Sequence, residues 1–164
     1  MIREPVEQDR PGLLSLAADI FPDEDLRPLV AALWREPGVL SLAAFRDAGP
    51  VGLVLFTPCG LEGKSALLGP LGVVTADQGQ GLGSRLVQTG VERLREIGTR
   101  QIFVLGDPAY YRRFGFRPEK AVTPPCPIPK DWAPAWQSLT LSDPIAPGEL
   151  QVPAPRLTPA YWAP

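Results

Sequence analysis

The spacing of apolar residues predicts two helices near the start of the chain. Residues 9–21 and 25–35 carry apolar side chains three or four positions apart, as on one face of an amphipathic helix. Asp9 is expected to cap the first helix, with Pro11 near its first position. Ahead of it, residues 1–6 are expected to form a short strand. The predicted apolar face of the first helix consists of Leu13, Leu14, Leu16, Ala17, Ile20 and Phe21.

Three apolar runs after these helices predict strands. Residues 39–45 and 51–56 are rich in strand-forming residues and are joined by a turn-like stretch, so they are expected to form an antiparallel hairpin. Residues 65–74 form a third strand that is interrupted by Gly69 and Pro70. Because proline has no N–H to donate, this strand is expected to part from a neighbour there.

A third helical pattern follows a glycine-rich stretch. Its apolar side is predicted to consist of Leu82, Leu86, Val87, Val91, Leu94 and Ile97. Gly98 is expected to end it, and residues 101–105 form the next buried strand. Asp107 is then expected to cap a short helix that ends at Gly115. Residues 136–141 form the last predicted strand.

Length and composition favour one globular domain. The chain has 164 residues, of which 45% are hydrophobic, so residues 1–164 are predicted to form a single domain with a sizeable core. Eleven of the 21 prolines lie in residues 121–164, together with Trp132, Trp136 and Trp162. The tryptophans are too apolar for a solvated linker. This proline-rich C-terminal segment is therefore expected to pack on the domain in an extended form.

The charge and the missing histidine exclude several classes of function. A formal net charge of −2 gives no basic field for nucleic acid or for an anionic membrane. Without histidine the chain has no Ser-His-Asp or Cys-His nucleophile, and no metal site is predicted. Cys59 and Cys126 lack metal-ligand spacing and are expected to be two small buried residues. Apolar runs too short for a membrane span, and no apolar leader at residues 1–10, predict a cytoplasmic location.

The run QGQGLGS at residues 78–84 lies between a predicted strand and a predicted helix. Its glycines remove side chains from the turn, so main-chain N–H groups can converge on a phosphate at the start of the helix. A flexible turn without a ligand is the alternative reading of the run alone. The GK[ST] sequence of a nucleotide-binding loop is absent, and so is the acidic residue that a dinucleotide fold places after its second strand.

Two stretches carry a resemblance to a known family. LGVVTADQGQGLGSRL at residues 71–86 and GDPAYYRRFGF at residues 106–116 together resemble the GNAT superfamily of N-acetyltransferases, in its YhbS-like branch. Gln78, Gly81 and Gly83 occupy the central motif of that superfamily. The resemblance implies an α/β (α+β) fold, with a mixed, mostly antiparallel sheet of about six or seven strands splayed in a V and flanked by about four helices. It covers about residues 66–118 at the level of motifs.

The resemblance also implies a function and a coenzyme. The chain is expected to be an acetyl-CoA-dependent N-acetyltransferase that moves an acetyl group to a primary amine by direct attack in a ternary complex. Acetyl-CoA is the expected acyl donor, and the acceptor is a small-molecule or protein amine. A non-catalytic acyl-CoA-binding or regulatory module is the alternative. A homodimer is considered, without a sequence feature that decides it.

The residues expected to hold the coenzyme follow from the resemblance. The main chain of Leu71 and Val73 is expected to pair with the pantetheine amides, while Gly72 keeps the approach open. The pyrophosphate is expected on the amides of residues 78–84. The full set is Leu71, Gly72, Val73, Gln78, Gly79, Gln80, Gly81, Leu82, Gly83 and Ser84. Candidates for the ribose phosphate are Arg85, Arg112 and Arg113, although arginines on a helix face are usually solvated.

Tyr111 is the candidate catalytic residue. It lies four residues before Gly115, where the family places the acid that assists the leaving thiolate. A packed aromatic side chain at a helix end is the alternative reading. The base that deprotonates the amine is not identified, and water relaying to Asp47 or Glu62 is considered. Leu71 is the expected main-chain donor to the oxyanion, because Pro70 has no N–H.

Overall fold

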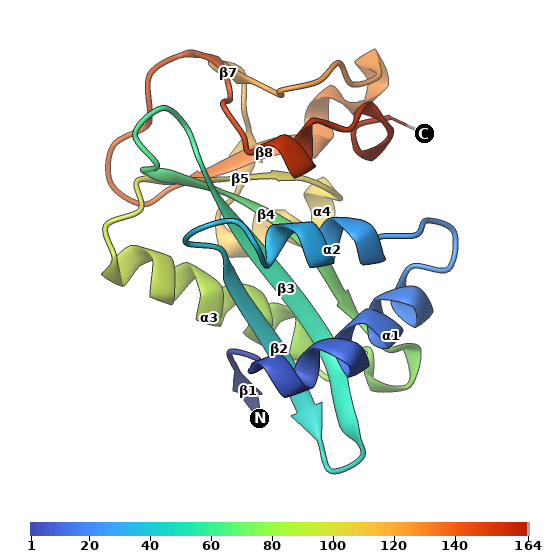
Figure 1. The fold of residues 1–164 in the computed structure, drawn as a ribbon. Coiled ribbons are helices and arrows are strands. Elements are labelled where there is room, and N and C mark those ends of the chain that lie inside the picture. The colour runs from blue at the N-terminus through green and yellow to red at the C-terminus, as the bar shows by residue number, and fades with distance from the viewer. Residues whose placement is uncertain (164) are drawn as a thin grey trace. The chain divides into compact units, whose positions relative to one another are not determined.

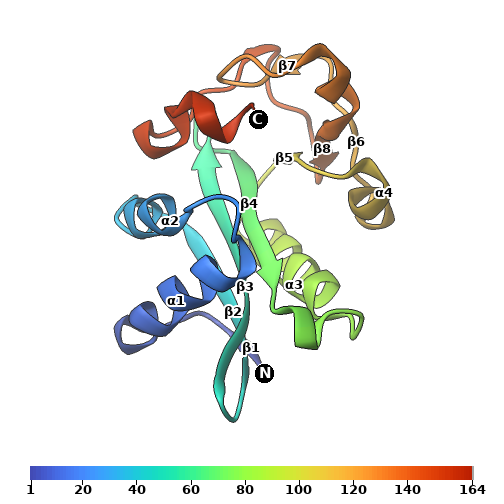
Figure 2. The ribbon, with the colours of Figure 1, turned by 90° about the vertical axis from the view of Figure 1, so that its right-hand side faces the viewer.

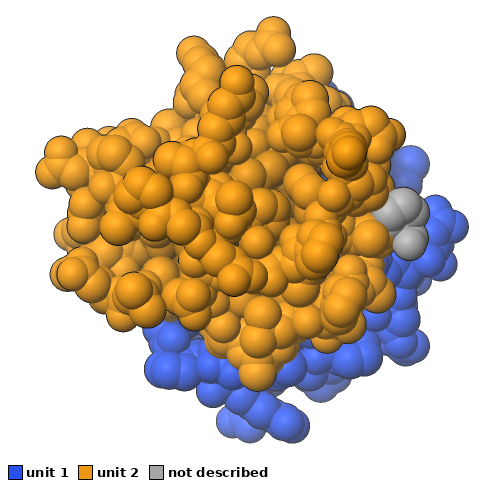
Figure 3. Space-filling view, turned by 90° about the horizontal axis from the view of Figure 1, so that it is seen from above, with its two compact units in different colours: residues 1–57, 69–93 blue, residues 58–68, 94–164 orange. Residues whose placement is uncertain are grey.

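The computed structural model describes residues 1–163. The chain packs into two compact units, coloured separately in Figure 3. Unit 1 comprises residues 1–57 and 69–93, and unit 2 comprises residues 58–68 and 94–164. The single domain expected over residues 1–164 stays a prediction.

A seven-stranded, mostly antiparallel sheet confirms the predicted fold class. In unit 1 the hydrogen-bonded order is β1 (Ile2–Arg3), β2 (Leu40–Arg46), β3 (Gly49–Cys59) and β4 (Ser65–Val73), the last two strands crossing the unit boundary. In unit 2 the order is β4, β5 (Gln101–Leu105), β8 (Trp136–Thr140) and β6 (Arg117–Pro118). The expected hairpin is present as β2 paired antiparallel with β3.

The pairing of β4 with β5 is short. The two strands run parallel over three residue pairs, from Ser65 with Gln101 to Leu67 with Phe103. This pairing ends just before Gly69 and Pro70, where the sequence predicted that the strand would part from a neighbour.

Helices cover both faces of the strands in unit 1. Figures 1 and 2 show α1 (Arg10–Ile20) and α2 (Arg27–Leu33) on one face and α3 (Leu82–Glu96), which continues into unit 2, on the other. A β-carbon built on Gly90 of α3 would lie 2.1 Å from Cε2 of Phe56 in β3. The helix can therefore pack this closely on β3 only because residue 90 has no side chain. The expected buried positions of α3 are confirmed for Leu82, Leu86, Val87, Val91 and Leu94.

Ile97 was wrongly predicted to belong to that buried side. The helix ends at Glu96, and Gly98 turns the chain with a positive φ of 86°. The helical spacing therefore no longer applies at Ile97, which is 75% exposed.

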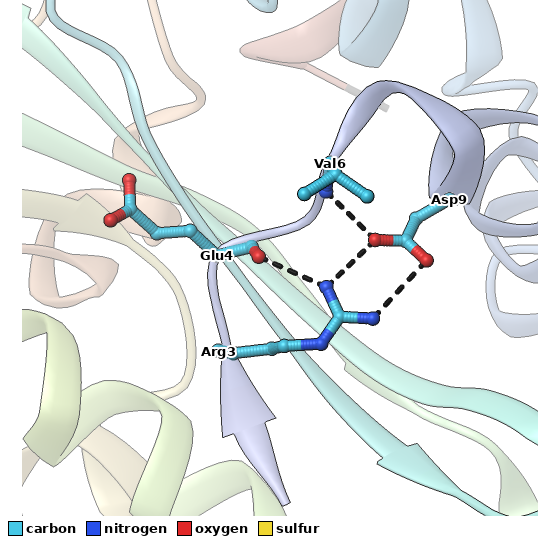
Figure 4. A network of polar contacts seen from close by, with 4 residues as sticks. All are labelled: Arg3, Glu4, Val6 and Asp9. Atoms are coloured by element: carbon cyan, nitrogen blue, oxygen red, sulfur yellow. Dashed lines mark hydrogen bonds and ion pairs between the residues drawn. The ribbon is translucent and has the colours of Figure 1, made fainter.

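The carboxylate of Asp9 does not cap α1 as predicted, although Asp9 directly precedes the helix. Its oxygens accept hydrogen bonds from the Arg3 guanidinium at 2.8 and 3.3 Å and from the Val6 N–H at 2.7 Å (Figure 4). The reason is that a 3-10 helix at Glu7–Asp9 precedes α1 and turns this side chain back. Hydrogen bonds from Arg3 and Val6 lower the pKa of the carboxyl.

Unit 2 is built around β5 and much of the proline-rich segment. Its helix α4 (Pro108–Tyr111) starts as predicted, because the Asp107 carboxylate accepts the Ala109 N–H at 2.9 Å. The strands β6, β7 (Val122–Thr123) and β9 (Gly148–Glu149) were not predicted, since two residues are too few to show a period. The remaining 3-10 helices are Thr75–Asp77, Arg112–Phe114, Lys130–Ala135, Ala154–Leu157 and Pro159–Tyr161.

The core of unit 2 draws on the segment after residue 121. Phe103 of β5 stacks on Trp136 at 5.6 Å, and Trp136 meets Trp162 edge-on at 5.8 Å. Both indole N–H groups donate to main-chain oxygens at 2.8 Å. The buried members of this core are Cys59, Leu67, Phe103, Val122, Cys126, Trp136, Leu150 and Trp162. Both cysteines are buried and form no disulfide, which confirms the expectation of two small buried residues.

Candidate functional site

The loop from β4 to α3 presents an open main-chain surface. Gly79 and Gly81 have positive φ angles of 78° and 79°, a conformation that side chains disfavour. No atom lies within 4 Å of a β-carbon built on either residue. Since α3 begins at Leu82, the exposed N–H groups of this turn adjoin the positive end of the helix dipole.

Side chains hold the loop at several points. The Gln78 amide donates to the Val73 carbonyl at 3.0 Å. Arg46, at the end of β2, donates from Nη2 to Gln80 Oε1 at 2.6 Å and from Nε to the Asp77 carboxylate. No local sequence pattern points to Arg46 and Asp77, because they lie 31 positions apart and in different elements.

Some main-chain N–H and C=O groups of β4 point away from β3. The Val74 N–H donates to the Val51 carbonyl at 2.9 Å, so Val74 faces β3. Because main-chain groups alternate along a strand, those of Val73 and Leu71 point the other way. These are the two residues that the family resemblance selected for pairing with pantetheine amides.

Gly72 has a packing role that the sequence did not reveal. A β-carbon at this position would lie 2.2 Å from Cγ2 of Ile20 and 3.0 Å from Cζ of Phe21. The absence of a side chain therefore admits the end of α1 onto β4. The space that was expected to stay open at Gly72 is filled by Ile20.

A small cavity of about 120 Å³ lies beside the loop in unit 1. Arg46, Gln80 and Arg85 are among its lining residues, so one of the three candidate arginines adjoins the loop. Arg112 and Arg113 belong to unit 2 and are exposed. The Arg113 guanidinium lies 4.6 Å from the centre of the Tyr110 ring and donates to the Tyr110 carbonyl.

Tyr111 lies in an aromatic cluster of unit 2 and is only 8% exposed. Its ring meets Tyr110 edge-on at 5.0 Å and Phe116 at 5.6 Å. Gly106 leaves room for it, because a β-carbon there would lie 2.5 Å from Tyr111 Cε2. Burial raises the pKa of the Tyr111 hydroxyl above its usual value, and the charges of Tyr110 and Asp107 add to this shift. The hydroxyl is therefore neutral at physiological pH and can donate a hydrogen bond.

The acids considered as bases are on the surface. Asp47 is exposed in the turn between β2 and β3, and the Glu62 carboxylate lies 3.7 Å from the Arg100 guanidinium.

Within residues 1–163, no group of three His, Cys, Asp or Glu side chains is placed to hold a metal ion. In the same range no helix has the length and apolar character to cross a membrane.

The amino-acid sequence matches a known protein family over most of its length. Residues 10–116 match the acetyltransferase (GNAT) family. The chain belongs to the GNAT family. That match begins well before the motifs at residues 66–118, so it includes both N-terminal helices and the hairpin.

Several relatives support the assignment to the GNAT family. YjhQ of Escherichia coli strain K12, named an uncharacterized N-acetyltransferase, is 36% identical in an alignment of 155 residues, and the match covers 88% of this chain and 80% of YjhQ. The crystal structure of E. coli YhbS in complex with CoA has a TM-score of 0.83 and 32% identity, covering 94% of this chain and 90% of YhbS. The crystal structure of a Brucella melitensis GNAT acetyltransferase in complex with acetyl-CoA has a TM-score of 0.77 and 29% identity. The match covers 94% of this chain and 96% of the Brucella chain.

These findings confirm the predicted family, its YhbS-like branch and the class of enzyme. The predicted coenzyme agrees with the CoA and acetyl-CoA in the two solved relatives. The match with YhbS covers 94% of the chain and so extends into the proline-rich segment at residues 121–164, which the motifs did not explain.

Proposed function

We propose that this protein transfers the acetyl group of acetyl-CoA to a primary amine of a small molecule or protein, by direct attack within a ternary complex. The observation that carries the proposal is the loop at residues 78–84, in which Gly79 and Gly81 leave main-chain N–H groups uncovered at the start of α3. A pyrophosphate fits such a turn, because the N–H groups and the helix dipole both favour an anion.

The coenzyme is proposed to lie along the edge of β4 and across the loop. Leu71 and Val73 offer main-chain groups that point away from β3, and pantetheine amides pair with such groups as an added strand does. The Val73 carbonyl already accepts a hydrogen bond from the Gln78 side-chain amide, so the Val73 N–H is the group left for pantetheine. Gly72 is left out of the proposed binding residues, because Ile20 fills the space beside it. The proposed binding residues are Leu71, Val73, Gln78, Gly79, Gln80, Gly81, Leu82, Gly83 and Ser84.

Tyr111 is proposed to assist the leaving group. The amine nitrogen attacks the thioester carbon and forms the new C–N bond, and the tetrahedral intermediate loses one proton from nitrogen to water. As the intermediate collapses, the C–S bond breaks with its electron pair on sulfur, and the released thiolate takes up a proton from water. The Tyr111 hydroxyl donates a hydrogen bond to the developing thiolate. Since burial raises the pKa of Tyr111 above that of a thiol, complete proton transfer from tyrosine is unfavourable and hydrogen bonding is the main contribution. The Leu71 N–H is the proposed donor to the oxyanion.

Two measurements test the proposal. Calorimetry should detect binding of CoA, and a panel of primary amines with acetyl-CoA should release free thiol faster than the spontaneous reaction. Tyr111→Phe should lower kcat by about 100-fold with little change in CoA affinity, as removal of one hydrogen-bond donor to a developing negative charge does. Tyr110→Phe, in the same aromatic cluster, is the matched control and should keep its turnover. Equal rates for the two variants would remove Tyr111 from the mechanism.

A non-catalytic acyl-CoA-binding or regulatory module is the second candidate. It is favoured by the composition of β4, which contains no carboxylate to act as a base. CoA binding without turnover on any amine would support it over the enzyme. A cytoplasmic location and a homodimer stay predictions from the sequence.

A further inference from the structure

Arg46 connects the end of β2 to the loop that carries the glycines. It is the only residue of unit 1, among those that the structure describes, that hydrogen-bonds side chains on both sides of Gly79. Its Nε donates to Asp77, and its Nη2 donates to Gln80 at 2.6 Å. One guanidinium thus spans the turn from the residue before Gln78 to the residue after Gly79.

The loop needs such a connection because its own main chain is permissive. Gly79 and Gly81 have no side chains, and nothing packs against the places where side chains would be. A turn of this kind loses much conformational entropy when it is held in a single conformation. A coenzyme that binds only that conformation loses affinity in proportion to the fraction of time that the loop spends elsewhere.

Arg46 also balances a charge at this place. The Asp77 side chain is 14% exposed, whereas the Arg46 side chain is 49% exposed, so water screens the carboxylate poorly and the guanidinium is its counter-ion. Asp77 directly precedes the proposed pyrophosphate loop in sequence, and its carboxylate shares the Arg46 guanidinium with Gln80 of that loop. Without Arg46 its negative charge would face an anionic ligand.

We propose that Arg46 is a positioning residue for the coenzyme: it holds the loop at residues 78–84 in its binding conformation and neutralises Asp77. This inference rests on the proposed function, since it assigns a role to Arg46 in the same coenzyme site. Arg46 itself need not touch the coenzyme. The role differs from that of a surface ion pair that merely adds stability.

The binding test uses the whole chain and CoA, with Kd measured by calorimetry. Arg46→Ala should weaken CoA binding by about five- to twentyfold, as expected for the loss of two charge-assisted hydrogen bonds at a half-exposed site. Arg46→Lys should have a CoA affinity between those of Arg46→Ala and the unmodified protein, because lysine keeps the positive charge but not the two forked donor groups. The double variant Arg46→Ala/Asp77→Asn should recover only in part, to an affinity between those of Arg46→Ala and the unmodified protein, since it removes the uncompensated charge but does not restore the hydrogen bonds that hold the loop.

Arg93→Ala is the matched control. The Arg93 side chain is about as exposed as that of Arg46, and it forms an ion pair with the more exposed Glu4 at 3.1 Å, in the same unit but away from the loop. Its loss should change the CoA Kd by less than twofold. An Arg46→Ala protein that binds CoA as tightly as the Arg93→Ala protein would overturn the proposed role.

A second readout needs no coenzyme. In the free protein, exchange of the hydrogen-bonded amides of Asp77, Gln78 and Arg85 at the two ends of the loop should be at least about fivefold faster in Arg46→Ala than in the Arg93→Ala control, because these hydrogen bonds break more often when the loop is not held. Unchanged exchange would refute the proposed hold on the loop. If the unmodified protein bound no CoA while Arg46→Ala still accelerated exchange, the coenzyme function would fail and the structural hold of Arg46 would stand.

Discussion

The main chain at Gly81 offers a sharp test of the coenzyme site. Gly81 has a φ of 79°, and no atom lies within 4 Å of a β-carbon built there. Alanine at this position therefore meets no clash in the free protein. Its cost is backbone strain of about 1–2 kcal/mol, reduced by about 0.4–1 kcal/mol because alanine also restricts the unfolded chain.

Gly63→Ala gives the same strain without touching the loop. Gly63 has a φ of 65°, equally open space around it, and a place in the turn between β3 and β4. Both variants should lose about 1 kcal/mol of unfolding free energy, which lowers Tm by about 2–4 °C in a chain of this size. Thermal unfolding followed by circular dichroism measures this shift.

Coenzyme affinity should separate the two variants. A methyl group on the open side of Gly81 would block a phosphate from the N–H groups and remove about 1.5–3 kcal/mol, the contribution of one hydrogen bond to a charged group. Calorimetry should then give a CoA Kd about 10- to 150-fold higher for Gly81→Ala and an unchanged Kd for Gly63→Ala. Equal affinity in both variants would refute the idea that these amides bind the pyrophosphate.

Two predictions concern stability. Gly90→Ala should destabilise the protein by about 2 kcal/mol in urea unfolding, because the new β-carbon would lie 2.1 Å from Cε2 of the fully buried Phe56. Helix propensity alone predicts a gain of about 1 kcal/mol, so a more stable variant would contradict the packing of α3 on β3. For Cys59, burial raises the pKa of the thiol from 9.0 to about 11. The unfolded thiol therefore loses its proton first, and about 2 kcal/mol of stability, present below pH 9, should be lost by pH 11. Cys59→Ala should lack that part of the alkaline loss, and an identical pH profile for both proteins would count against the burial of the thiol.

Most elements were readable from local sequence. The hairpin of β2 and β3, the strand β5 and the start of α4 at Asp107 all followed from period and turn residues. Ile97 and Asp9 show where this reading fails. Each lies at the end of a helix. Ile97 follows the last residue of α3, and Asp9 belongs to a 3-10 helix that precedes α1, so neither side chain has the direction that the helical spacing predicts.

The candidate site was readable only in part. The glycines of the loop were visible, because a positive φ needs glycine whatever lies around it. The burial of Tyr111 against Gly106, and the use of Gly72 to admit Ile20, were not visible. In both cases the glycine serves the packing of a particular side chain, and the sequence does not say which one.

By itself the sequence determined which of the longer segments become helices and strands, where the glycine-rich turn falls, and to which family the chain belongs. These properties depend on residues within a few positions of one another. The tertiary structure decided that Arg46 holds Asp77 and Gln80, and that Trp136 and Trp162 complete the core around Phe103. Such contacts join residues tens of positions apart, and only the folded chain brings them within the few ångströms over which hydrogen bonds and packing act.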